Sequence, residues 1–267
     1  MNSTLNDSIL PNMWDVSKEP FAPIDDVFQK WSDIVVPIYV EHMRARNAMN
    51  GLGSSFIVQS AGRYFLVTAL HVAEDARRFS FHFANMNGAG IDIGGLSFVV
   101  SEPHDLAIAE LTHDWLNAHE IKCLKAVPIA EKDKTWIKPN LFLLLGYPGS
   151  KNKLSIAFGK LDRHILSITA ELKEANFAKT KVVDATQFDY DHKTTINSQL
   201  INLGGKPALQ GMSGGPALQI VYKKSMGTIH LSVQLAGVLS EWRKANRSVV
   251  ATSAQSVRNL LRTYYDA

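Results

Sequence analysis

The sequence predicts an all-β fold that ends in one α-helix. Short apolar segments, rich in β-branched and aromatic residues, recur along the chain, and glycines and prolines separate them. With 267 residues, of which 46% are hydrophobic, the chain is long enough for one large domain or for two lobes, each with its own core. An apolar stripe at helical spacing follows the last predicted strand.

The first predicted strands lie in the N-terminal half. Residues 34–40 are β-branched and apolar, and residues 56–58 and 64–68 flank Ser60-Ala61-Gly62-Arg63, which has the composition of a hairpin turn. Further strands are expected at residues 79–83, 96–100 and 106–111. Residues 1–30 carry three prolines and little periodicity, so we expect an extension that lies over the domain or stays mobile.

The second half of the chain begins after a charged stretch, residues 122–138, which has few strand signals and is the expected crossing between two lobes. Strands are then predicted at residues 141–145, 154–158, 216–221 and 229–239. Residues 161–200 give no clear pattern beyond short strands and loops. Because long unclassified loops are often functional, this segment and the N-terminal extension are candidates for a regulatory switch.

The C-terminal segment predicts a helix. Thr252 and Gln255 have the spacing of a capping box. One apolar stripe runs along the segment: Val257, Leu260, Leu261 and Tyr264. Because such stripes usually face a core, we expect the helix to dock on the second lobe; a partner-binding helix is the alternative.

Composition and local patterns exclude several classes of function. A net charge of +3 without a dense Lys/Arg block argues against nucleic acid as a partner. One cysteine, Cys123, cannot form an intrachain disulfide, which favours a reducing compartment. The N-terminus lacks the pattern of a signal peptide and no apolar run is long enough to span a bilayer, so we expect a cytoplasmic protein without a membrane partner. No metal-ligand spacing, P-loop or dinucleotide fingerprint occurs, so we expect no cofactor.

A glycine-rich turn contains the best candidate nucleophile. Gly211-Met212-Ser213-Gly214-Gly215-Pro216 places a serine among glycines, which leave space for a substrate carbonyl and let the backbone turn. A serine hydroxyl needs a base to become nucleophilic. We predict Ser213 as the nucleophile, with the backbone N–H groups of Gly211 and Ser213 as the oxyanion hole. An ordinary Gly-rich hairpin is the alternative.

His71 is the candidate base. It follows the apolar strand predicted at residues 64–68, within Thr68-Ala69-Leu70-His71-Val72. A histidine at the end of a buried strand can turn one ring nitrogen to the serine and the other to an acid. A lone histidine in this place would more often be a packed, hydrogen-bonded residue. The Gly-rich serine turn elsewhere in the chain favours the catalytic interpretation.

Asp105 is the candidate acid, because it opens an apolar strand where its carboxylate could accept a hydrogen bond from the imidazole. Its rivals are Asp75, which suits a surface role just after His71, and Asp92, which lies in a Gly-rich loop. The order His71, Asp105, Ser213 is that of the chymotrypsin arrangement, whereas α/β-hydrolases and subtilisins have other orders.

These segments resemble the trypsin-like serine peptidases, and most closely their bacterial, HtrA-like branch. The resemblance rests on T-A-x-H, D-L-A-I and G-x-S-G-G-P in this order. Gly146-Tyr147-Pro148-Gly149 is similar to a turn of that branch, and Gly237-Val238-Leu239-Ser240 to the strand that pairs with substrate. The resemblance covers residues 33–265. Because the sequence ends with the predicted helix, we expect no PDZ domain.

The resemblance implies two six-stranded antiparallel β-barrels with the active site in the cleft between them. A protease domain would span residues 31–267, with lobe one at about 33–125, lobe two at about 138–253 and the C-terminal helix at about 253–265. It also implies hydrolysis of peptide bonds in a protein or peptide substrate through an acyl-enzyme. Met212 stands where trypsin has an acid before the nucleophile, so activation through an ion pair with a new N-terminus is not expected.

By the same resemblance, seven residues are expected to bind substrate: Pro207, Ala208, Gln210, Ser240, Glu241, Trp242 and Ala251. Pro207 stands where trypsin has its specificity-giving acid, so selection of Lys or Arg is not expected. Ala208 and Ala251 suit small or medium apolar side chains. Trp242 would narrow the entrance of the pocket. Attraction of a basic substrate residue by Glu241, at the rim of the pocket, is the alternative. The backbone from Ser240 to Trp242 should align the substrate as an added strand.

The sequence therefore predicts a serine endopeptidase. One alternative is a protease that is latent until a protein partner or ligand triggers it. The other is a protease-fold binding or scaffold protein that does not cut, although a scaffold has no need of a nucleophile beside an oxyanion pocket. The natural substrate, the trigger and the oligomeric state are not encoded in any recognisable motif.

Overall fold

The computed structural model describes twelve stretches of the chain: residues 35–41, 49–77, 81–84, 90–118, 138, 140–149, 154–155, 160–161, 165–173, 180–189, 209–225 and 228–264. The expectations for residues 1–30, for nearly all of the crossing at 122–138, for much of 161–200, and for Pro207 and Ala208 lie outside the described residues. Within the described part of the chain, no helix combines the length and the apolar character needed to cross a bilayer.

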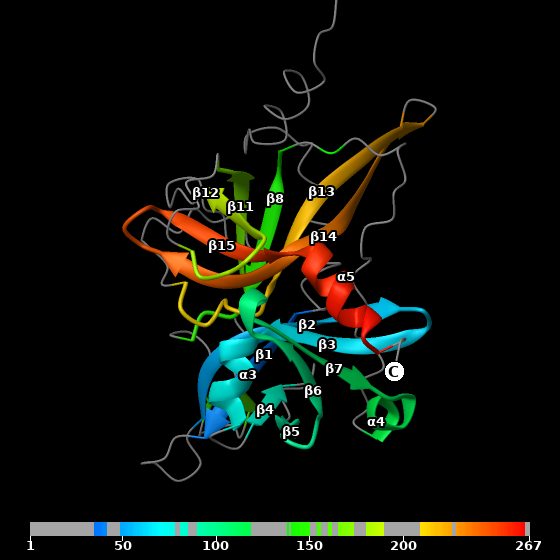
Figure 1. The fold of residues 1–267 in the computed structure, drawn as a ribbon, viewed down its shortest axis with the longest axis vertical. Helices are drawn as coiled ribbons and strands as arrows, with labels where there is room; N and C mark the ends of the chain where they lie inside the picture. Colours follow the sequence, from blue (N-terminus) through cyan, green and yellow to red (C-terminus); the bar gives the residue numbers. More distant parts are fainter. Residues whose placement is uncertain are drawn as a thin grey trace, which may run out of the picture.

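Two antiparallel β-structures make up the described fold, and they lie one above the other in Figure 1. The first is a seven-stranded sheet in the order β5-β4-β1-β2-β3-β7-β6. Its strands are β1 (Val35–Glu41), β2 (Met49–Ser60), β3 (Arg63–Ala69), β4 (Phe81–Ala84), β5 (Gly90–Asp92), β6 (Phe98–Ser101) and β7 (Leu106–Leu111). The hairpin between β2 and β3 turns at Ala61 and Gly62, both with positive φ.

The second structure is a closed barrel of six strands, in the order β11-β12-β15-β14-β13-β8. Its strands are β8 (Phe142–Gly146), β11 (Leu166–Leu172), β12 (Ala185–Asp189), β13 (Pro216–Ser225), β14 (Thr228–Arg243) and β15 (Ser248–Ser253). A two-stranded pair, β9 (Leu154–Ser155) and β10 (Lys160–Leu161), is separate from it. The prediction of two closed barrels is thus corrected for the part of the chain that the structure describes: there only the second structure closes, and β5 and β6 are the two edges of the first sheet.

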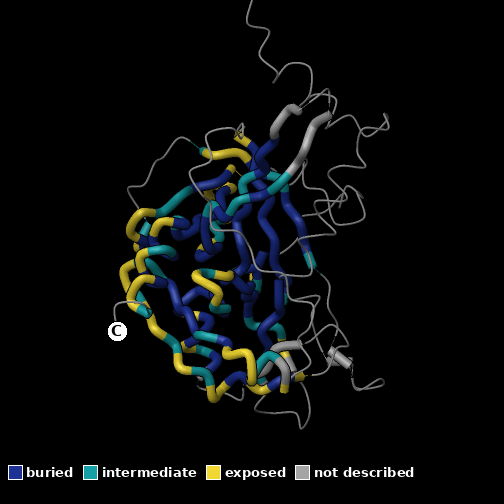
Figure 2. The backbone as a smooth tube through the Cα atoms, turned by 90° about the vertical axis from the view of Figure 1, so that its right-hand side faces the viewer, coloured by how far each residue is buried: buried dark blue, intermediate teal, exposed yellow. Residues whose placement is uncertain are grey.

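The central strands of the first sheet are buried on both faces, because neighbouring residues of one strand enter different cores. Phe65 and Val67 of β3 belong to a core shared with the barrel, whereas Leu66 between them packs on the opposite face with Val72 and Ala76. Val72 and Ala76 belong to helix α3 (Leu70–Arg77). This alternation is the period of two expected of a strand. Figure 2 shows the buried strands running through the middle of the molecule, with exposed backbone at the outer turns.

The core shared by the two structures fixes how they sit against each other. Phe56 and Leu106 of the first sheet pack in one cluster with Leu143 and Leu218 of the barrel. All four side chains are at most 2% exposed. Burial of this size contributes roughly 1.5–3 kcal/mol for each large apolar side chain, so the junction between the two structures is a stabilised part of the fold.

The C-terminal helix α5 (Ala254–Arg262) closes one side of this junction (Figure 1). Its buried residues Val257 and Leu261 belong to the shared core, and the helix contacts strands of both structures. The expected docking on the second lobe is confirmed, and the first sheet adds contacts that were not predicted. The predicted cap is also corrected. Ser253 caps the helix by accepting a hydrogen bond from the Ser256 N–H, because the Thr252 hydroxyl donates to the carbonyl of His104 instead.

Tyr264, just past α5, fastens the helix to the first sheet. Its hydroxyl donates to the carbonyl of Ile108 at 2.8 Å, and its ring lies 5.1 Å from that of Phe65. Arg63 donates to the Tyr264 carbonyl at 3.0 Å and also pairs with Glu110, whose pKa it lowers. These contacts tie the end of the chain to β3 and β7.

Removing only the Tyr264 hydroxyl should measure this attachment. In Tyr264→Phe the ring remains, but the Ile108 carbonyl loses its donor, so we expect a loss of about 1 kcal/mol of unfolding free energy. Urea denaturation should show a lower midpoint with an unchanged slope, and the reactivity of the site should be unaffected. An unchanged midpoint would show that water replaces the hydroxyl at no cost.

Candidate active site

The register of two neighbouring strands brings His71 and Asp105 together. In the pairing of β3 with β7, Ala69 lies opposite Leu106, so the residues just beyond these ends meet. The Leu70 N–H donates to the Asp105 carbonyl at 3.0 Å. His71 is the second residue of helix α3, which begins where β3 ends, and Asp105 directly precedes β7.

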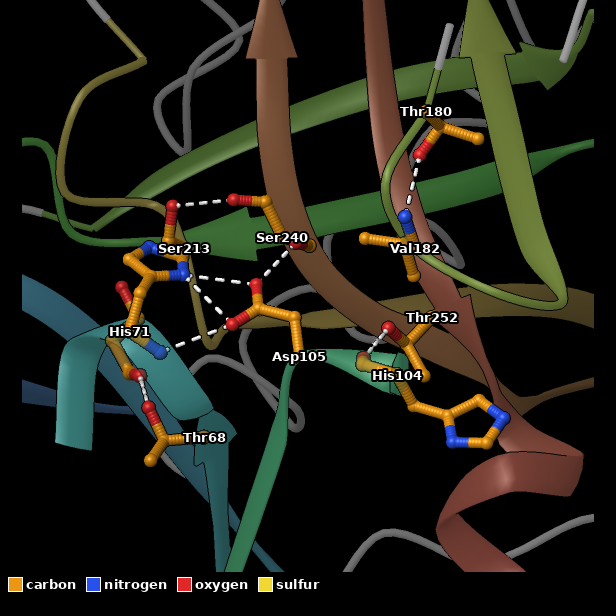
Figure 3. Close-up of polar contacts among 10 residues, drawn as sticks. Thr68, His71, His104, Asp105, Thr180, Val182, Ser213, Ser240 and Thr252 are labelled. Carbon is orange, nitrogen blue, oxygen red and sulfur yellow. Dashed lines mark hydrogen bonds and ion pairs between the residues drawn. The ribbon is translucent and has the colours of Figure 1, made fainter. Parts of the chain in front are cut away.

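The His71 ring is bonded to the Asp105 carboxylate (Figure 3). Its Nδ1 lies 2.8 Å from Asp105 Oδ2 and 3.0 Å from Oδ1, and the His71 backbone N–H also donates to Oδ1 at 3.0 Å. This arrangement fixes the tautomer: the Nδ1 proton faces the carboxylate, and Nε2 is left as the basic atom. The His71 side chain is 46% exposed, so a substrate can reach the ring.

Electrostatics strengthen this pair. Burial of the His71 ring disfavours its protonated form, but the hydrogen bond and the charge of Asp105 outweigh burial, with smaller contributions from Asp75 and Glu74, and the pKa of His71 is raised above its ordinary value. Burial also opposes ionisation of Asp105. The hydrogen bonds from His71 and Ser240 prevail, so the pKa of Asp105 is lowered.

Asp105 is held in an unusual backbone conformation by contacts from the barrel. Its φ of 47° and ψ of 50° are left-handed, which aspartate tolerates better than most residues. The carbonyls of the two residues before it are both engaged from the barrel side: Val183 N–H donates to the Pro103 carbonyl at 2.8 Å, and the Thr252 hydroxyl donates to the His104 carbonyl. The position of the acid therefore depends on both β-structures.

Ser213 lies just before β13, where the pairing of β13 with β14 places it next to Ser240. Its hydroxyl donates to the Ser240 carbonyl at 2.9 Å. The Ser240 hydroxyl, in turn, donates to Asp105 Oδ2. Ser240 thus connects the serine turn to the His71–Asp105 pair, and all four residues appear in Figure 3. In this state the Ser213 proton is given to a carbonyl and not to His71.

The two rival acids lie elsewhere. Asp92 ends β5, and its Oδ1 accepts the N–H of Gly94 in its own loop at 2.8 Å. Asp75 is on α3 and acts on His71 through its charge, while the ring nitrogen bonds to Asp105.

A pocket opens beside Ser213. Six apolar residues and three polar ones line it. The apolar residues are Leu144, Leu209, Met212, Leu239, Trp242 and Val249, and the polar ones are Ser213, Ser240 and Glu241. Three of the seven residues expected to bind substrate, Ser240, Glu241 and Trp242, are among them. Ala251 is fully buried behind Leu239, its partner in the pairing of β14 with β15, and the exposed Gln210 does not line the pocket.

Sequence reasoning missed two features of this pocket. Val249 pairs with Trp242 across β14 and β15, so the two side chains meet at the same pocket wall. Glu241 forms an ion pair with Arg243 at 3.0 Å. The pairing of Val249 with Trp242 could not be predicted from the sequence, because residues 244–247, which join β14 to β15, carry no clear hairpin signal. Among the described residues, no group of three or more His, Cys, Asp or Glu side chains gathers to hold a metal ion.

The fold is similar to that of a solved structure. The crystal structure of an inactive-form serine-to-alanine mutant of Rv3671c from M. tuberculosis H37Rv matches it with a TM-score of 0.50 and 15% sequence identity, over 92% of this chain and 94% of that one. No protein-family model matches the chain, and no curated protein matches it. The likeness extends over nearly the whole of both chains and concerns the fold alone.

Proposed function

We propose that this protein is a serine endopeptidase in which His71, Asp105 and Ser213 form the catalytic triad. The observation that carries the proposal is the connected set of hydrogen bonds from His71 through Asp105 and Ser240 to Ser213. A purely structural role would not require His71 to be exposed while a carboxylate sets its tautomer. Nor would it require this pair to lie near a serine in a glycine-rich turn.

The proposed reaction begins when an extended peptide pairs with β14 near Ser240. A substrate N–H that bonds to the Ser240 carbonyl displaces the Ser213 hydroxyl, which then turns to His71. His71 Nε2 takes the hydroxyl proton while Oγ attacks the scissile carbonyl, and the oxyanion is held by the N–H groups of Gly211 and Ser213. The C–N bond breaks as His71 protonates the leaving amine, and water then hydrolyses the acyl-enzyme by the same steps.

A fluorophosphonate probe tests this proposal directly, because it phosphonylates only an activated serine. The wild-type protein should be labelled, and Ser213→Ala, with the same melting temperature, should not. Ser240→Ala should lose only part of the labelling, because it removes the Oγ contact to Asp105 but keeps the carbonyl. Labelling that survives in Ser213→Ala would refute the assignment of the nucleophile.

A well-folded wild type that does not react would contradict constitutive activity. The resting hydrogen bond from Ser213 to the Ser240 carbonyl is the observation that favours the latent alternative. In that case, labelling should appear when a peptide that binds along β14 is added. If it does not, the scaffold function remains, with proteins or peptides as partners.

We further propose that the pocket accepts small apolar side chains at the residue before the cleaved bond. Trp242 and Val249 lie side by side on one wall of it, and the charge of Glu241 is already paired with Arg243. Both features argue against aromatic and basic residues in this position.

Peptide substrates that differ only at this residue can measure the effect. Wild type should cleave after Ala better than after Phe, and Trp242→Ala should shift the ratio of kcat/KM toward Phe by roughly 10- to 100-fold. The indole N–H has no hydrogen-bond partner in the described structure, so its removal leaves no broken bond. Glu241→Gln is the control and should leave the ratio for Lys over Ala nearly unchanged. A ratio unaltered by Trp242→Ala would contradict the proposed wall.

A further inference from the structure

The turn that precedes Ser213 is held at three successive peptide groups. The Gln210 carbonyl accepts the Gly149 N–H at 2.8 Å, the Gly211 carbonyl accepts the Ser54 hydroxyl at 2.8 Å, and the Met212 carbonyl accepts the Gly215 N–H at 3.0 Å. In a trans peptide the N–H points away from its carbonyl. The Gly211 N–H shares its peptide group with the Gln210 carbonyl, and the Ser213 N–H with the Met212 carbonyl, so these two N–H groups are directed away from Gly149 and Gly215. The Met212 N–H, opposite the Gly211 carbonyl, donates to the Leu209 carbonyl at 3.1 Å.

Two of the three partners act through backbone groups of the barrel, but the third is a side chain of the first sheet. Ser54 lies on β2, is fully buried, and its hydroxyl makes two bonds. It donates to the Gly211 carbonyl and accepts the Tyr147 N–H, each at 2.8 Å. Tyr147 begins the turn whose Gly149 N–H holds the Gln210 carbonyl. One hydroxyl thus fixes the Gly211–Met212 peptide group directly. It acts on the Gln210–Gly211 group, which carries the Gly211 N–H, through this turn.

The backbone of Ser54 reinforces the same junction. Its N–H donates to the Ser213 carbonyl at 2.8 Å, and its carbonyl accepts the Thr68 hydroxyl at 2.8 Å, three residues before His71. The segment around Gly211 and the turn at residues 147–149 approach so closely that no side chain would fit between them. A Cβ on Gly211 would lie 2.5 Å from the Gly149 nitrogen and 2.7 Å from the Tyr147 oxygen. The turn and the oxyanion segment are therefore in direct backbone contact, and Ser54 bonds to both.

We propose that Ser54 is a positioning residue: its hydroxyl holds the turn that carries Gly149 and fixes the neighbouring Gly211–Met212 peptide group, and through these contacts it orients the Gly211 N–H for the oxyanion from the opposite β-structure. This inference rests on the proposed function. Ser54 does not touch substrate. Without its hydroxyl, the Gly211 carbonyl and the Tyr147 N–H would each lose a hydrogen bond, and the peptide groups would be free to rotate toward other partners.

Ser55 provides a matched control. It is the next residue of β2, is equally buried, and its hydroxyl donates to the Val36 carbonyl at 3.1 Å within the first sheet. Ser55→Ala makes the same chemical change and loses one buried hydrogen bond without touching the oxyanion segment. A purely structural role for Ser54 predicts that the two alanine variants behave alike once differences in stability are allowed for.

The kinetic test compares Ser54→Ala with Ser55→Ala on one peptide substrate and one peptide boronate, which binds as a tetrahedral adduct. Loss of one oxyanion donor lowers kcat by roughly 10²- to 10³-fold, and a misdirected donor should cost part of that, roughly 10- to 100-fold. We expect this loss in kcat for Ser54→Ala with little change in KM, and a matching rise in the inhibition constant of the boronate. Ser55→Ala should keep the wild-type kcat. Equal kcat values for the two variants would overturn the proposal.

Amide hydrogen exchange keeps the test independent of activity. The N–H groups of Gly149, Met212 and Gly215 are bonded within the turn and the oxyanion segment. They should exchange faster in Ser54→Ala than in Ser55→Ala, and equal exchange would refute the positioning role even if wild type proves unreactive. An unreactive wild type with the expected exchange pattern would instead refute only the proposed function. If Ser54→Ala does not fold, Ser54→Cys, which keeps the volume but is a weak donor, should show the same changes to a smaller degree.

Discussion

Replacing Asp105 by asparagine is expected to lower kcat by about 10⁴-fold while leaving the protein folded. The His71 backbone N–H bonds to Oδ1, which should keep the remaining oxygen of the amide on that side. The NH₂ group would then face His71 Nδ1 in place of Oδ2. A donor there requires Nδ1 to be unprotonated, so the proton moves to Nε2, and the base that Ser213 needs is lost.

The pH dependence should change in the same variant. Activity requires neutral His71, so in wild type it rises as the pH increases through the raised pKa of His71. Without the carboxylate, burial of the ring remains and the largest contributions that raise the pKa of His71 disappear. The acid limb of the kcat/KM profile should therefore move to lower pH, even though the plateau is much lower.

Asp184→Asn is the matched control for this experiment. Asp184 is a carboxylate 3.7 Å from the ring of His104, and its side chain is 69% exposed. The same substitution there should leave both kcat and the pH profile unchanged. If Asp105→Asn retained most of its activity, another group would have to orient His71, and the proposed triad would be wrong.

The sequence identifies the three candidate site residues better than it identifies the contacts that hold them in place. Ser213 and His71 stand out through local patterns, and Asp105 through the order of the three residues along the chain. Ser54 and the Ser240 hydroxyl give no local signal, because their partners lie 93 to 157 residues away in the sequence. Such contacts depend on how the two β-structures meet, which no window of sequence contains.

The fold also separates into features that local sequence patterns predict and contacts between distant segments that they do not. The apolar stripe of α5 was read correctly from its period, but a period identifies which face is buried and not what covers it. Both β-structures contribute to its site, so the prediction of one docking surface was too narrow. Closure of the first sheet was predicted through resemblance, and closure depends on strand stagger and tilt, which composition does not specify. Thr252 and Ser253 offer neighbouring hydroxyls for the cap, and a contact to distant His104 decides between them.

A methyl group at Gly214 should be among the most destabilising single changes to this protein. Gly214 has a φ of +86°, and an added Cβ would lie 2.0 Å from the Ser54 carbonyl oxygen and 2.3 Å from the Thr68 hydroxyl oxygen. The first is backbone of β2, and on its other side the Gly214 N–H donates to the Leu239 carbonyl at 2.6 Å. The residue is thus wedged between the two β-structures, and neither side can retreat without opening the shared core.

Gly62→Ala separates this clash from the cost of the backbone conformation. Gly62 also has positive φ, +78°, but an added Cβ meets nothing within 4 Å. Its substitution should therefore cost only about 1–2 kcal/mol of unfolding free energy. Gly214→Ala should cost more than about 4 kcal/mol, seen as a much lower denaturation midpoint or loss of soluble protein. Equal costs would mean that the nucleophile turn is not pressed against β2. A larger cost at Gly214 would show that Ser213 is held where the two β-structures meet, so that its placement and the stability of the fold depend on the same contacts.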